Sequence, residues 1–141
     1  MKTKIILFAS IIMFGFSVMA QQVEINQKLY AKYDKAYLEK LQKENPEQLK
    51  KMNFFADHFG YIIDMPDKPI EHKDLIRLSD NSKNITLEEL KDFNPYLYNC
   101  KNDLTRTTYY KIGNTGKLLI VRSLQDLNRM YDNYTKTLKN N

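Results

Sequence analysis

The sequence is poor in the residues from which most catalytic and metal sites are built. Its 141 residues include one cysteine, two histidines and no tryptophan. The single cysteine, Cys100, excludes a disulfide within the chain and any zinc or iron–sulfur site made of several cysteines. His58 and His72 are fourteen residues apart, a spacing that matches no helical or hairpin pair of metal ligands. We therefore predict no metal and no other cofactor.

The chain also has little excess of positive over negative charge once the first twenty residues are set aside. The whole chain has a formal net charge of +5, but Lys2 and Lys4 lie in the first twenty residues, which contain no acidic residue. The remainder has twenty basic and seventeen acidic residues, a net charge of +3. This balance argues against a protein that binds nucleic acid through a strongly basic surface. Regularly spaced apolar residues also exclude a disordered polar chain.

The first twenty residues show the three parts of an export signal. A short basic segment with Lys2 and Lys4 precedes the apolar run 5–18, and Val18-Met19-Ala20 supplies a cleavage site before polar Gln21. The run is shorter than the roughly 20 apolar residues that a membrane span needs, and an uncleaved anchor is the alternative. We predict a cleaved signal peptide at 1–20, a single domain at 21–141 and a periplasmic or secreted location.

The first half of the predicted domain is helical. Apolar and aromatic residues recur about every four positions between Glu24 and Lys43, which predicts one long amphipathic helix. Asn45 suits a helix N-cap and Pro46 the first helical position, so a second helix is predicted over 46–59. Gly60 is a candidate C-cap for that helix. These two segments form a predicted N-terminal helix pair.

The middle of the chain has weaker patterns. Residues 61–65 predict a short strand, whereas 67–83 predict mostly loop. Thr86 and Glu89 fit a capping box for a short helix over 87–93. Residues 96–98 are a further candidate strand.

The C-terminal part has the clearest strand pattern. Two runs rich in branched and aromatic residues, 107–112 and 117–122, flank a Gly/Asn turn and predict a β-hairpin. The second run is apolar on both faces, as in a central strand. Ser123 and Asp126 predict the start of a final helix whose buried side includes Leu127, Tyr134 and Leu138. The fold class is therefore α+β: an N-terminal helix pair, a small and mainly antiparallel sheet with a C-terminal β-hairpin, and a C-terminal helix.

No catalytic residue is predicted. Cys100 is interpreted as a small buried hydrophobe, with an intermolecular disulfide and a reactive thiol as alternatives. Ser123 is explained by its capping role. The run Gly113-Asn114-Thr115-Gly116-Lys117 resembles a phosphate-binding loop, but a strand follows it, and a hairpin turn is favoured.

Tyrosine is the one compositional excess, and all ten tyrosines follow the first twenty residues. Tyrosine suits the rim of a small core, and it also suits a surface that binds a protein or a glycan. On a strand over 96–100, Tyr96 and Tyr98 share a face, and in the hairpin Tyr109 and Lys111 share another. These four residues are the candidate binding residues: Tyr96, Tyr98, Tyr109 and Lys111.

Two segments carry a resemblance. The junction Val18-Met19-Ala20-Gln21-Gln22 resembles export signals common in Bacteroidota. The stretch YYKIGNTGKLLIV at 109–121, with the helix that follows it, resembles small exported proteins of unknown function from that phylum. The resemblance implies a compartment and a C-terminal fold, but no residue role.

Two hypotheses from different classes follow. The first is an exported, non-enzymatic binding protein that contacts a protein or glycan of the cell envelope through a tyrosine-rich face. It binds no nucleic acid and does not span the membrane after cleavage. The alternative is a small cell-wall or glycan hydrolase that uses Cys100 or a carboxylate such as Asp64.

Overall fold

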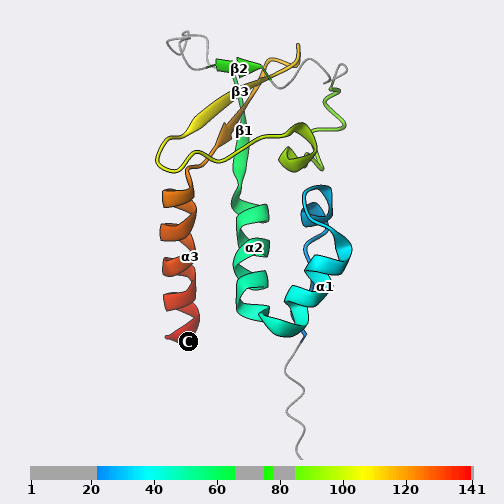
Figure 1. The fold of residues 1–141 in the computed structure, drawn as a ribbon. Helices are drawn as coiled ribbons and strands as arrows, with labels where there is room; N and C mark the ends of the chain where they lie inside the picture. The colour runs from blue at the N-terminus through cyan, green and yellow to red at the C-terminus, as the bar shows by residue number, and fades with distance from the viewer. Residues whose placement is uncertain (1–21, 66–74, 78–84, 141) are drawn as a thin grey trace, which may run out of the picture.

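The computed structural model describes residues 22–65, 75–77 and 85–140 as an α+β fold. The sheet lies at one end of the molecule, and the helices extend away from it with α2 between α1 and α3 (Figure 1). The predicted fold class is confirmed. In chain order the elements are the 3-10 helix η1 (Gln27–Ala31), α1 (Lys35–Glu44), α2 (Pro46–His58), β1 (Gly60–Asp64), β2 (Leu75–Arg77), the 3-10 helix η3 (Pro95–Tyr98), β3 (Thr108–Ile112), β4 (Lys117–Val121) and α3 (Leu124–Lys139).

The sheet has the strand order β1-β4-β3-β2. Its β1–β4 and β3–β4 pairs are antiparallel, and β2 pairs in parallel with β3. The sheet is therefore mainly antiparallel, as predicted. β4 lies between β1 and β3, and its residues from Leu118 to Val121 are all buried, which confirms it as a central strand.

The turn between β3 and β4 depends on two glycines. Gly113 has a φ of 45° and Gly116 a φ of 70°, values in the left-handed region that favours glycine. Thr115 donates a hydrogen bond from its hydroxyl to the carbonyl oxygen of Ile112 at 2.6 Å. The predicted hairpin is confirmed, and the glycine-containing segment is its turn.

The prediction of one long helix over 24–43 is wrong. Asp34 has an extended backbone, and its side chain accepts a hydrogen bond from the backbone N–H of Ala36 at 2.7 Å. It therefore starts α1 as an N-cap and separates this helix from η1, because a capping carboxylate competes with helical backbone bonds. The second helix is confirmed, with the Asn45 side chain accepting from the N–H of Gln48.

Gly60 has a role other than the predicted C-cap. It is the first residue of β1 and lies opposite Val121 of β4. A Cβ atom at this position would collide with the backbone carbonyl oxygen of Ile120. The glycine therefore lets β1 approach β4 closely.

Two weak predictions in the middle of the chain are wrong. Thr86 and Glu89 do make the capping-box hydrogen bonds, at 2.7 and 3.3 Å, yet 87–92 form turns rather than a helix. So short a segment gains too few backbone hydrogen bonds to offset the cost of helix nucleation.

The candidate strand at 96–98 is instead part of η3. Asn94 caps this 3-10 helix by accepting a hydrogen bond from the backbone N–H of Tyr96. Of the predicted loop 67–83, residues 75–77 form β2, and the rest lies outside the described residues.

Two clusters of buried side chains form the interior. The sheet core contains Phe59, Ile85, Cys100, Tyr110, Ile112, Leu119 and Val121. The helix core contains Ile25, Leu29, Leu38, Leu49 and Ala56. Tyr96 packs against both clusters and so connects the two halves of the molecule.

The C-terminal helix begins as predicted but is less buried than predicted. The Ser123 hydroxyl accepts from the N–H of Asp126 at 3.1 Å, and Leu127 is fully buried. Tyr134 and Leu138, however, are 49% and 59% exposed. Both belong to the C-terminal half of α3, and this helix extends away from the sheet beside α2 (Figure 1). No helix in the described ranges is long and apolar enough to cross a bilayer.

Candidate functional site

The structure divides the four candidate binding residues into two pairs. Tyr96 and Tyr98 lie in η3 and pack against the sheet core. Tyr109 and Lys111 point to the opposite face of β3, because they alternate with Tyr110, which belongs to that core. The four residues therefore do not share one surface, and their role in binding stays a prediction.

Tyr96 and Tyr98 contribute mainly to packing. The Tyr96 ring meets the Phe59 ring edge-on with centroids 5.1 Å apart, and Tyr98 stacks on Phe93 at 5.0 Å. Burial raises the pKa of Tyr96 to about 12. Burial also raises the pKa of Tyr98, although less strongly. These rings stabilise the junction between η3 and the sheet.

The two candidate nucleophiles have structural roles. Cys100 is 4% exposed within the sheet core, which confirms its interpretation as a small buried hydrophobe. Burial raises the pKa of its thiol to about 12, so the reactive thiolate is scarce at neutral pH. The hydroxyl of Ser123 is 2.9 Å from a carboxylate oxygen of Asp126 and serves the helix cap.

The acidic residues that flank β1 are engaged in ion pairs. Asp64 pairs with Lys117 across the β1–β4 ladder, and Asp57 pairs with Lys28 at 3.2 Å. Across the described ranges, no group of three or more His, Cys, Asp or Glu side chains is arranged to hold a metal ion. His72 lies outside the described residues.

An aromatic groove lies between α2 and α3, and we name it the α2–α3 groove. Its volume is about 610 Å³, within the usual range for ligand-binding sites. Three rings line it: Phe54 lies 5.3 Å from Tyr131 and 5.2 Å from Tyr134, measured between centroids. The full lining consists of Glu47, Lys50, Asn53, Phe54, Asp57, His58, Tyr131, Tyr134, Thr135, Leu138 and Lys139.

The sides of the α2–α3 groove are polar, and their carboxylates are paired. Glu47 lies 2.6 Å from Lys50, and this hydrogen bond raises the pKa of the Lys50 ammonium. Asp57 is neutralised by Lys28 of η1. The groove therefore combines an aromatic floor with a rim on which each acidic side chain has a lysine partner.

His58, the last residue of α2, also lines the α2–α3 groove. Its ring stacks on Phe54 with centroids 4.0 Å apart, and its Nδ1 lies 2.8 Å from the carbonyl oxygen of Phe54. When Nδ1 carries the proton and donates to that oxygen, Nε2 is an acceptor. The histidine thus adds a polar atom to an otherwise aromatic surface.

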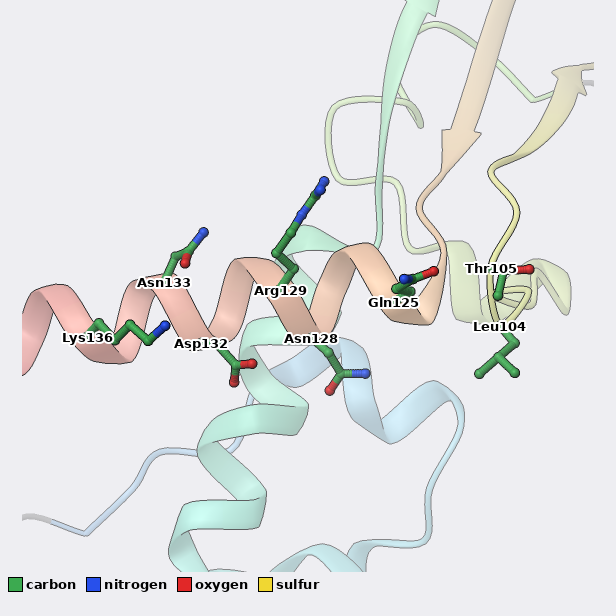
Figure 2. A pocket seen from close by; sticks show the side chains of 8 residues that line it. All are labelled: Leu104, Thr105, Gln125, Asn128, Arg129, Asp132, Asn133 and Lys136. Carbon is green, nitrogen blue, oxygen red and sulfur yellow. The ribbon is translucent and has the colours of Figure 1, made fainter.

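A second hollow, of about 580 Å³, runs along the other side of α3, and most of the residues that line it have polar or charged side chains. Arg129 and Asn133 point to one side of the helix, whereas Asn128 and Asp132 point to the other (Figure 2). Arg129 also pairs with Asp126 at 2.8 Å. These side chains do not converge on a common point, so the α2–α3 groove is the better candidate site.

The spacing of the α3 residues in the groove is visible in the sequence. Tyr134 and Leu138 share one side of α3, where the spacing predicts a buried face, but both are about half exposed. Phe54 was not identified as a site residue, since nothing in the sequence pairs α2 with α3.

Comparisons of the chain with protein-family models, curated proteins and solved structures give no match.

Proposed function

We propose that this protein is an exported, non-enzymatic binding protein that contacts a macromolecule outside the cytoplasmic membrane through the α2–α3 groove. The observation that carries the proposal is the half-exposed pair Tyr134 and Leu138 beside the ring of Phe54. Exposed aromatic side chains grouped in a hollow are typical of binding surfaces. The proposal thus assigns the tyrosine-bearing binding surface to the helices rather than to the sheet.

The two residues named in the hydrolase hypothesis, Cys100 and Asp64, favour binding over hydrolysis. Cys100 is buried and its thiol pKa is about 12, so it is a weak nucleophile near neutral pH. Asp64, the carboxylate of the alternative hydrolase hypothesis, is engaged by Lys117. Neither residue lines the α2–α3 groove.

The location rests on the N-terminal pattern and on its resemblance to Bacteroidota export signals. The test is to express the whole chain with a C-terminal tag in a bacterium that has two membranes and to fractionate the cells. We expect the protein in the periplasm or medium, with Gln21 as its first residue by mass spectrometry. A cytoplasmic protein that retains Met1 would contradict export.

Binding is tested by sedimentation with isolated envelope fragments. We expect the exported protein to sediment with them and Tyr134→Ala to lower the bound fraction about tenfold. Tyr37→Ala is the matched control, since Tyr37 is a 44% exposed tyrosine on α1. Equal sedimentation of the wild type and Tyr134→Ala would overturn the role of the groove.

A further inference from the structure

We propose that the α2–α3 groove binds an uncharged glycan chain, with the sugar rings packed against Tyr134 and its neighbours. This inference rests on the proposed function, because it takes the groove to be the binding surface. Three properties of the groove carry it: the exposed ring of Tyr134, the paired charges of the carboxylates that line the groove, and the polar atoms within it.

The groove offers one partly exposed aromatic ring to a ligand. Tyr134 is 49% exposed, whereas the Phe54 ring is stacked by His58 with centroids 4.0 Å apart. Phe54 and Tyr131 therefore support the Tyr134 ring, from which their own rings lie 5.2 and 6.4 Å away. The C–H faces of a pyranose ring are apolar and flat, and they pack well on exposed aromatic rings of this kind.

The charges around the groove favour an uncharged ligand. Glu47 is paired with Lys50 and Asp57 with Lys28, so neither carboxylate offers an unmatched charge to a cationic partner. A polyanion would find Lys139 at the exposed end of α3, but the other lining lysine, Lys50, is held by Glu47. A neutral chain can bind while these exposed pairs stay in place.

The polar atoms of the groove suit the hydroxyl groups of a sugar. Tyr131 and Tyr134 each contribute a phenolic hydroxyl that can donate and accept hydrogen bonds. His58 adds Nε2, since its Nδ1 is engaged by the carbonyl oxygen of Phe54. A sugar can therefore stack on the rings and exchange hydrogen bonds at their edges.

An apolar helix from a partner, or from a second copy of this chain, fits the groove less well. The apolar face of such a helix is buried best against apolar side chains that interlock with its ridges, and most residues that line this groove are charged or polar, with Leu138 as the one aliphatic side chain among them. Self-association through this surface would be seen in the test as a dimer.

The test is a titration of the exported protein with uncharged hexasaccharides, followed by two-dimensional amide NMR. The probes are cellohexaose, maltohexaose, laminarihexaose and chitohexaose, with hexagalacturonate as an anionic chain of equal length. We expect at least one uncharged probe to shift amide signals of residues 131–138. We also expect hexagalacturonate to bind at least about tenfold more weakly.

Variants separate the ring from the hydroxyl. Tyr134→Ala should weaken binding of the uncharged probe about tenfold or more, whereas Tyr134→Phe, which retains the ring, should stay within about threefold of the wild type. Tyr37→Ala should bind as the wild type does. Raising the salt concentration from about 0.05 to 0.5 M should leave the affinity unchanged, because screening acts on charged ligands.

The outcomes distinguish this inference from the proposed function. If no uncharged probe binds while sedimentation with envelope fragments still requires Tyr134, the glycan inference is overturned and the proposed function stands. A dimer that Tyr134→Ala dissociates would show a second copy in the groove and would also overturn the inference. If Tyr134→Ala changes neither glycan binding nor sedimentation, both proposals fail.

Discussion

The two sides of α2 are built from different side chains. Towards η1 and α1, Leu49 and Ala56 lie in the helix core and are at most 2% exposed. Towards α3, Phe54 meets Tyr131 and Tyr134, and the outer ring is half exposed. Small aliphatic side chains allow close packing, whereas large rings keep two helices apart and leave space between them. One side of α2 therefore stabilises the fold, and the other presents a surface.

The largest expected loss of stability follows from removing a side chain on the closed side of α2. Leu49 is fully buried, and Leu49→Ala removes its apolar contacts and leaves a cavity. We expect the free energy of unfolding to fall by about 2–5 kcal/mol, measured by urea denaturation. A change below about 1 kcal/mol would show that the helix core is not close-packed.

The next largest loss of stability is expected where α2 leads into β1, and it tests the close packing of β1 against β4. Gly60→Ala places a methyl group against the backbone carbonyl of Ile120, which cannot move without disturbing β4. We expect a loss of about 1–3 kcal/mol in the free energy of unfolding. Gly113→Ala is a useful control, because its Cβ meets no atom within 4 Å and only its positive φ opposes the change.

The pH dependence of stability tests whether the sheet core excludes water from Cys100. Burial raises the Cys100 pKa from 9.0 to about 12, so above pH 9 the unfolded thiol loses its proton while the folded one keeps it. Its contribution to stability is complete below pH 9 and is lost as the pH rises towards 12. Between pH 7 and 10.5, the wild type should lose about 1–2 kcal/mol more stability than Cys100→Ala.

The difference between the wild type and Cys100→Ala isolates the contribution of the thiol to the pH dependence of stability. The raised pKa of Tyr96 also lowers stability at high pH, but it does so equally in both proteins. Alkylation supplies an independent check. The folded protein should react with iodoacetamide at pH 8 far more slowly than the urea-unfolded protein. Equal rates would show that the sheet core admits solvent at Cys100.

The smallest expected loss of stability is on the open side of α2. Tyr134 is half exposed, so Tyr134→Ala should lower the free energy of unfolding by less than about 1 kcal/mol while it weakens ligand binding. Urea denaturation of this variant beside Leu49→Ala gives the contrast directly. A loss as large as that of Leu49→Ala would show that the α2–α3 groove belongs to the core.

The parts of the fold that were predictable are set by residues that lie close together in the sequence. Asn45-Pro46 starts α2, Ser123 with Asp126 starts α3, and Gly113 and Gly116 shape the hairpin turn. Caps and turns act over one to four residues, so the sequence shows them directly. Asp34 is also a cap, but the apolar spacing on both of its sides concealed the break between η1 and α1.

The site was less predictable, because exposure depends on which elements meet. The tyrosine excess directed attention to aromatic side chains, but the four candidates lie on two surfaces, because Tyr96 and Tyr98 form a 3-10 helix instead of a strand. Tyr134 and Leu138 have the spacing of a buried stripe. Whether such a stripe is covered depends on the neighbouring helix and on the size of the side chains between them.

By itself, the sequence determined the α+β class, the helix starts, the hairpin and the central position of β4. Each follows from local backbone chemistry or from the alternation of apolar residues. Only the tertiary structure decided that Gly60 meets β4, that Cys100 is enclosed, and that Phe54 meets Tyr131 and Tyr134 in the lining of an open groove. These features join residues far apart in the chain, and their burial is set by the packing of whole elements.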